Sequence, residues 1–142
     1  MSCEGYRRPT KSNMAAYLLD TSALIDWLGG SSSVRRLITG LVESGHDLAV
    51  CCVSVAELYS GLADHDRPIV DGAIEPMEYW DIGPTVAKLA GYYRYAYSRE
   101  GVQLSTPDAL LAALAVGQEA YLVIGNVKDF PMPELKLEPL PG

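Results

Sequence analysis

Three acidic residues that lie far apart in the sequence could do chemistry together. Asp20 directly follows an apolar run, Glu57 comes shortly after a second one, and Asp108 lies in a Thr-Pro-Asp-Ala motif at the start of a predicted helix. A fold of strands and helices could gather all three at one edge. Carboxylates brought together repel one another, so they must either take up protons or bind a divalent cation. The pattern predicts an oxygen-ligand site of a metal-assisted hydrolase.

Each acid also has a structural interpretation that involves no chemistry. Ser54-x-x-Glu57 fits a capping box, in which the glutamate bonds the first amide of its own helix. Asp108 could stabilise the first turn of a helix through the helix dipole, and Asp129 could cap or turn the chain before the next proline. Asp20 is harder to explain in this way, because a carboxylate directly after five apolar residues loses solvation if it is buried. The acids taken together favour the cation site.

Several other catalytic classes lack their usual motifs in this sequence. His46 and His65 both lie in predicted polar turns, without a second histidine at ligand spacing, which argues against a zinc site or an imidazole base. No GxSxG, Walker or GxGxxG motif is present. Cys3, Cys51 and Cys52 form no CxxC pair, and we expect them to pack as small apolar side chains.

Length and composition favour one folded globular domain. The chain has 142 residues, of which 49% are hydrophobic and 20% are charged. No apolar run is long enough for a membrane span, so we expect a cytoplasmic protein without a membrane partner. The formal net charge of −7 is the wrong sign for binding nucleic acid through a broad basic surface. A nucleic-acid substrate would therefore need bound cations, a few local basic residues or a basic partner protein.

Alternating apolar strands and amphipathic helices indicate an α/β fold. Residues 1–14 show no periodicity and are expected to be an extension, whereas residues 15–142 are expected to form the domain. Strands are predicted at 15–19, 48–53, 77–82, 121–124 and 135–137, and helices at 21–28, 31–44, 54–62, 84–101 and 107–118, the last with Thr106 as its cap. Residues 63–76 are rich in turn formers and predict a loop. The expected architecture is an α/β/α sandwich with a mostly parallel four- to five-stranded sheet, whose ligands bind beyond the carboxyl ends of the strands.

Four segments contain the acids, in this order: Tyr17-Leu-Leu-Asp20-Thr-Ser-Ala-Leu-Ile-Asp26, Val53-Ser-Val-Ala-Glu57-Leu, Leu104-Ser-Thr-Pro-Asp108-Ala-Leu-Leu-Ala-Ala113 and Gly125-Asn126-Val-Lys-Asp129-Phe130. With these segments, which cover most of residues 17–130, the sequence resembles the PIN-domain ribonucleases, and most closely the VapC-type toxins of toxin–antitoxin pairs. The order and spacing of the segments make the match specific. The resemblance implies a PIN-like fold and an endoribonuclease that cleaves RNA with metal-activated water.

The resemblance also assigns roles within the expected site. Asp20, Glu57 and Asp108 match the three acids that bind Mg²⁺ or Mn²⁺ in the family, and Asp129 matches a less regular fourth acid. Asn126 could orient the fourth acid or a metal-bound water. Thr21 or Ser22 could contact a phosphate. Two departures from the family pattern are Ile124, where a threonine is frequent, and the loop predicted at residues 63–76, where a helix is common.

The same resemblance implies binding partners. A cognate VapB-like antitoxin would fill the groove and inhibit the enzyme, and a basic antitoxin would explain the acidic charge. Operator DNA would then be bound only through the antitoxin. A homodimer is expected, with the tyrosine-rich helix that begins at Pro84 as its surface. One alternative stays open, in which a catalytically idle PIN-like module binds antitoxin or RNA without cleaving it.

Overall fold

A five-stranded parallel sheet forms the centre of the molecule. The computed structural model of the chain describes residues 14–141. The strand order is β3-β2-β1-β4-β5, and every neighbouring pair is parallel. The strands are β1 (Ala16–Leu19), β2 (Asp47–Cys51), β3 (Glu78–Trp80), β4 (Tyr121–Ile124) and β5 (Lys136–Pro139). The predicted sheet is confirmed, and the extension expected at residues 1–14 lies, apart from Met14, outside the described residues.

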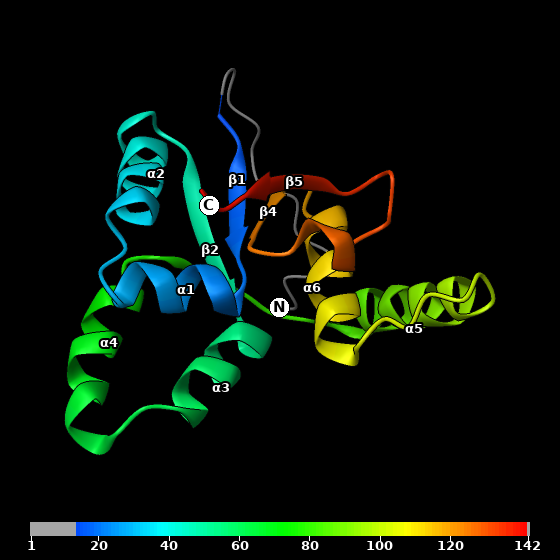
Figure 1. Cartoon of the computed structure of the whole chain (residues 1–142), viewed down its shortest axis with the longest axis horizontal. Coiled ribbons are helices and arrows are strands. Elements are labelled where there is room, and N and C mark those ends of the chain that lie inside the picture. The colour runs from blue at the N-terminus through cyan, green and yellow to red at the C-terminus, as the bar shows by residue number, and fades with distance from the viewer. Residues whose placement is uncertain (1–13, 142) are drawn as a thin grey trace.

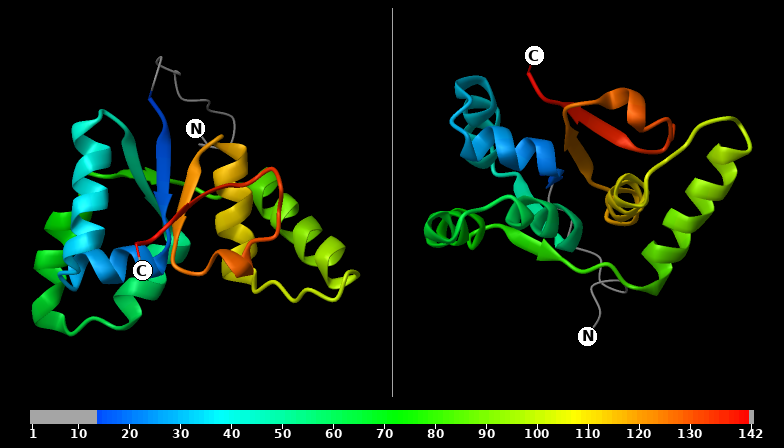
Figure 2. Two further views of the ribbon diagram at one scale, coloured as in Figure 1. Left: turned by 45° about the horizontal axis from the view of Figure 1, so that its top comes forward. Right: turned by 60° about the horizontal axis from the view of Figure 1, so that its bottom comes forward.

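Helices cover both faces of this sheet (Figures 1 and 2). They are α1 (Thr21–Leu28), α2 (Ser32–Glu43), α3 (Cys52–Ser60), α4 (Arg67–Ile74), α5 (Pro84–Ser98) and α6 (Thr106–Gly117), with short 3₁₀ turns at Asp64–Asp66 and Val127–Asp129. Helices α1 to α4 lie on the left of Figure 1, and α5 and α6 lie on the right. The α/β/α sandwich predicted from the sequence is therefore confirmed.

The core is divided by the sheet into two apolar clusters. Along β1, Ala16 and Leu18 belong to the cluster under α5 and α6, whereas Tyr17 and Leu19 belong to the cluster under α1 and α2. A parallel strand buried on both faces needs a continuous apolar run, which is the pattern that predicted this strand. Because the alanines of α6 are fully buried, this helix lies close against the neighbouring elements. These alanines are Ala109, Ala112, Ala113 and Ala115.

The loop predicted at residues 63–76 is wrong, because most of this segment is helical. A 3₁₀ turn leads into α4, which covers Arg67–Ile74. Pro68 lies in the first turn of α4, where a missing amide hydrogen costs nothing. Val70 is buried in the core and fixes the helix by packing. Turn-forming residues were thus compatible with a helix start, and the chain does not lack the helix that is common in the family.

Two helix starts also differ from the sequence-based prediction. Helix α3 begins at Cys52, so Ser54 lies inside it with its Oγ donating to the Cys51 carbonyl (3.4 Å). The capping-box interpretation of Glu57 is therefore wrong. Helix α6 is capped by Ser105 rather than Thr106, because the Ser105 Oγ accepts the amide hydrogen of Asp108 (3.1 Å).

The cysteine prediction holds for one of the two described cysteines. Cys51 ends β2 and is buried, whereas Cys52 opens α3 and is exposed. Cys3 lies outside the described residues. Among residues 14–141, no helix combines the length and apolar character needed to cross a membrane. Tyr92 and Tyr95 on α5 are 63% and 59% exposed, and a homodimer through this helix stays a prediction.

Adjacent residues on α1 allow a direct test of the core assignment. Leu24 is fully buried, whereas Ile25 is 52% exposed. Leu24→Ala should lower the free energy of unfolding by about 2–5 kcal/mol through lost burial and a residual cavity. Ile25→Ala should lower it by less than about 1 kcal/mol. Urea unfolding measures both, and equal losses for the two variants would contradict the packing described here.

Candidate active site

A cavity of about 360 Å³ lies at the carboxyl edge of the sheet. Every residue predicted for the site lines it. The lining residues are Asp20, Thr21, Ser22, Glu57, Asp108, Leu111, Gly125, Asn126, Asp129 and Phe130. The structure therefore brings together acids that are separated by up to 109 residues (129 − 20) in the sequence.

The parallel sheet explains why these residues meet. Asp20 directly follows the central strand β1, and its backbone amide donates to the Val123 carbonyl of β4 (3.2 Å). Because β1 and β4 run in the same direction, the turn after β4 that carries Asn126 and Asp129 begins at the same edge. Helix α3 follows β2 on the other side of β1 and supplies Glu57.

Asp20 is both a helix cap and a wall of the cavity. Its Oδ1 accepts hydrogen bonds from the Ala23 amide (2.9 Å) and the Ser22 hydroxyl (2.8 Å). Burial raises the pKa of Asp20 above its ordinary value, and the negative charge of Asp108 raises it further, against the opposing effect of these hydrogen bonds. The carboxylate is thus ordered by the fold while its charge is unfavourable.

Asp108 connects the other acids electrostatically. Burial is the largest cause that raises the pKa of Asp108, and the charges of Asp129 and Glu57 add to it, whereas a hydrogen bond with Ser105 lowers it. Since Asp108 also raises the pKa of Asp20, the four carboxylates form one group of interacting like charges.

The remaining acids are held by neighbouring side chains. The Thr21 hydroxyl donates to Oε1 of Glu57 (2.5 Å). The Asn126 Nδ2 donates to Oδ2 of Asp129 (3.1 Å), while its Oδ1 accepts from the Lys128 amide (3.3 Å). Both contacts fix the direction of a carboxylate that could otherwise rotate.

The donor set of the cavity consists of oxygen ligands suited to a hard cation. Within residues 14–141, the ion pairs join His65 to Asp66 and Arg67 to Asp64, so neither neutralises an acid of the cavity. Among these described residues, no three acidic, histidine or cysteine side chains stand ready as a complete metal-binding group. This arrangement fits a cation held by one or two carboxylates together with water, which is how Mg²⁺ is usually bound. It does not fit a preformed zinc centre.

Three lining residues were not predicted from the sequence. Leu111 and Phe130 are buried and give the cavity an apolar wall. Gly125 lies so close to Ser22 that an added Cβ would be 3.3 Å from the serine Oγ. The apolar periodicity of α6 could have indicated Leu111, but the close approach at Gly125 depends on the fold. Ile124 is fully buried in the core, so the position where the family often has threonine faces away from solvent here.

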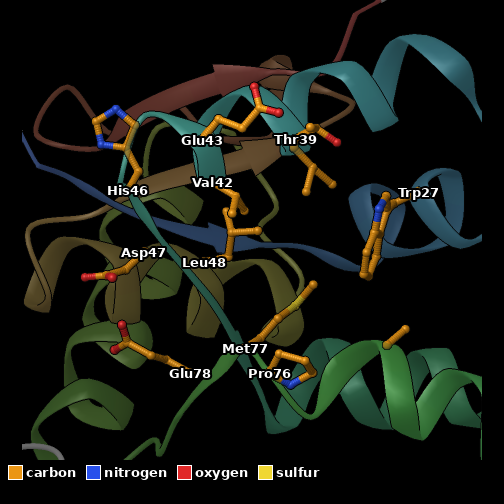
Figure 3. A pocket seen from close by; sticks show the side chains of 12 residues that line it. Trp27, Thr39, Val42, Glu43, His46, Asp47, Leu48, Pro76, Met77 and Glu78 are labelled. Atoms are coloured by element: carbon orange, nitrogen blue, oxygen red, sulfur yellow. The ribbon is translucent and has the colours of Figure 1, made fainter.

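Two other cavities are lined by different residues. Figure 3 shows one of about 720 Å³, where Trp27, Val42, Leu48 and Met77 present apolar side chains and none of the predicted site residues takes part. A second groove, of about 510 Å³, runs between α1, α3 and α4. Only the second shares a residue, Glu57, with the acidic cavity. Glu57 therefore lies between this groove and the acidic cavity.

Comparisons with known proteins agree with this fold. The family model described as PIN domain matches residues 17–126. Ribonuclease VapC10 of Mycobacterium tuberculosis is 31% identical over 115 residues, which cover 81% of this chain and 86% of the relative. Ribonuclease VapC19 of the same organism is 27% identical over 122 residues, covering 84% and 96%.

Solved structures share the same fold. VapBC2 from Rickettsia felis, bound to a DNA fragment from its promoter, superposes with a TM-score of 0.78 at 23% identity, covering 87% of this chain and 98% of the other. DNA-bound VapBC from Salmonella typhimurium gives a TM-score of 0.77 at 22% identity, covering 89% and 99%. At these identities the similarity shows the architecture.

The raised pKa of Asp108 predicts a pH-dependent effect of its replacement. In the metal-free protein, a carboxyl whose pKa is raised by folding contributes its full stabilisation when the pH is below its pKa in the unfolded chain, near 3.8. This stabilisation is lost as the pH rises through its pKa in the folded protein. Asparagine carries no such charge. The free energy of unfolding of Asp108→Asn should therefore increase relative to wild type through this window and then stay level.

Urea unfolding in the presence of a chelator, from about pH 3 to pH 7, measures this difference. A difference between the two proteins that is constant, or that decreases as the pH rises, would contradict the burial and repulsion assigned to Asp108.

Proposed function

Because this chain belongs to the PIN domain family, we propose that it is a VapC-like endoribonuclease toxin that cleaves RNA with the help of Mg²⁺ or Mn²⁺. The observation that carries the proposal is the meeting of Asp20, Glu57, Asp108 and Asp129 on one cavity, although they come from four separate parts of the chain. The named relatives are ribonucleases, which supports RNA as the substrate class.

Asp20, Glu57 and Asp108 would hold the cation, one or two of them directly and the rest through its bound water, and Asp129 would complete its surroundings. A divalent cation at this place supplies the positive charge that activates water and stabilises charge developing on the phosphodiester. The carboxylates contribute by their position and by their mutual repulsion, which favours binding of a positive ion. Leu111 and Phe130 would provide an apolar wall beside the acids.

The residues after β4 would orient the substrate. Asn126 keeps Asp129 in one direction through the hydrogen bond to Oδ2. Lys128 lies in the same 3₁₀ turn and is exposed, so it can meet a backbone phosphate at the mouth of the cavity. One local cation of this kind, together with the bound metal, would attract RNA in spite of the net charge of −7.

The groove between α1, α3 and α4 would receive the antitoxin. Its wall is apolar at Ile25, Leu28 and Ile69, and Glu57 joins it to the acids. A partner segment with apolar anchors could fill the groove and direct a basic side chain at the carboxylates. The VapBC structures from Rickettsia felis and Salmonella typhimurium are both bound to DNA, which supports operator binding through the antitoxin. Such a system would act in the cytoplasm.

Replacing the central acids tests the catalytic proposal. Asp20→Asn and Asp108→Asn should each reduce RNA cleavage at least about 100-fold, because each removes a charge that the cation needs. Asparagine is as good a helix cap as aspartate, so Asp20→Asn keeps the first turn of α1. Asp26→Asn is the matched control, since Asp26 is exposed on the same helix and does not line the cavity.

The measurement is cleavage of total cellular RNA by purified, antitoxin-free protein, with Mg²⁺ or Mn²⁺ and with chelator. Calorimetry with Mn²⁺ provides the binding constant. Cleavage that is equal in wild type and Asp20→Asn would remove the proposed mechanism. A wild-type protein that neither cleaves RNA nor binds Mn²⁺ would instead be the idle module.

A groove variant tests the antitoxin site separately from catalysis. Ile69 is 72% exposed and lines the groove, so Ile69→Asp should weaken binding of the antitoxin encoded beside this chain at least about tenfold. RNA cleavage without antitoxin should stay at the wild-type rate. Ile69→Leu keeps an apolar side chain and should bind normally in the same titration. Unchanged affinity in Ile69→Asp would place the antitoxin elsewhere.

A further inference from the structure

The first turn of α1 is hydrogen-bonded to three of the segments that carry an acid of the cavity. Thr21 Oγ1 donates to Glu57 Oε1 on α3 at 2.5 Å, across 36 residues of sequence. Its hydroxyl hydrogen is therefore already used by a carboxylate. The contact joins the end of β1 to the second turn of α3, at the residue that lines both the cavity and the groove.

Ser22 makes a second connection on the opposite side. Its hydroxyl donates to Asp20 Oδ1 (2.8 Å) and accepts the amide hydrogen of Gly125 (3.2 Å), across 103 residues of sequence. Gly125 opens the turn that leads to Asp129. The absence of a side chain at Gly125 permits this close approach, because a Cβ there would lie 3.3 Å from the serine oxygen.

These hydrogen bonds leave little capacity for a phosphate. The hydroxyl hydrogens of Thr21 and Ser22 both point to carboxylates, and the Ser22 oxygen also accepts a backbone hydrogen bond. A hydroxyl has one hydrogen to donate. Contact with substrate, the role expected from the sequence, would require these bonds to break, whereas a role in placing the acids uses them as they are.

We propose that Thr21 and Ser22 are positioning residues that tie Glu57, Asp20 and the turn after β4 to one helix end, so that each of these carboxylates is held in one direction before a cation binds. The proposal rests on the proposed function and extends it to the support of the metal site. Ordering like charges in advance matters because each carboxylate would otherwise rotate away from its neighbours. Residues that orient metal ligands typically contribute 10- to 100-fold to metal affinity.

The first experiment measures Mn²⁺ affinity by calorimetry without RNA. Thr21→Val and Ser22→Ala remove one hydroxyl each, and each should weaken binding about 10- to 100-fold. Thr21→Ser keeps the hydroxyl and should restore wild-type affinity. Ser98→Ala is the matched control, because Ser98 donates a hydrogen bond to the Tyr95 carbonyl on α5 and does not line the cavity.

RNA cleavage then separates positioning from substrate contact. If the hydroxyls place metal ligands, activity lost in Thr21→Val and Ser22→Ala returns as the Mn²⁺ concentration is raised. If they bind phosphate instead, the KM for RNA rises while Mn²⁺ affinity stays at the wild-type value. The second result would overturn the proposal.

A metal-free measurement keeps this inference distinct from the proposed function. In Ser22→Ala, the Gly125 amide loses its hydrogen-bond acceptor, so its hydrogen exchange should become about three- to tenfold faster in chelator. Wild type that fails to bind Mn²⁺ or cleave RNA would refute the nuclease proposal, whatever the exchange rate. Unchanged hydrogen exchange of the Gly125 amide in Ser22→Ala would refute the positioning role. If wild type binds Mn²⁺, unchanged Mn²⁺ affinity in Thr21→Val and Ser22→Ala would refute it as well.

Discussion

One electrostatic constraint governs the candidate site: the carboxylates that share its small cavity repel one another. Burial and neighbouring charge raise the pKa values of Asp20 and Asp108, so the folded chain holds these groups in an environment that disfavours their ionised form. The two apolar clusters on either face of the sheet provide the stability that tolerates this cost. Residues that bind cations are commonly grouped in this way, and the grouping lowers the stability of the fold.

The parallel sheet turns this constraint into a defined geometry. Every strand ends at one edge, and the central strand β1 has β2 and β4 as neighbours, so residues that follow these three strands are brought together. The fully buried alanines of α6 let this helix approach closely, which brings Asp108 to the same place. Hydrogen bonds from Thr21 and Ser22 then hold the carboxylates of Glu57 and Asp20 in one direction.

The sheet and the cavity residues could be predicted because their signals are local in sequence: apolar runs ended by acids. Local patterns mispredict the structure where tertiary packing decides which conformation a segment adopts. Burial of Val70 stabilises a helix in a segment whose proline and glycine suggested a loop. Ser54 resembled a helix cap, although α3 had already begun at Cys52. The link between Ser22 and Gly125 spans 103 residues, and no pattern along the chain indicates it.

The strand order also bears on how the protein is made. β1 is synthesised first, but its partner β4 emerges from the ribosome about a hundred residues later, and Asp129 follows only after that. A nascent chain that stops before β4 lacks one side of the central strand and one wall of the cavity. Translation therefore cannot assemble the four acids before β4 and the turn that carries Asp129 have been made.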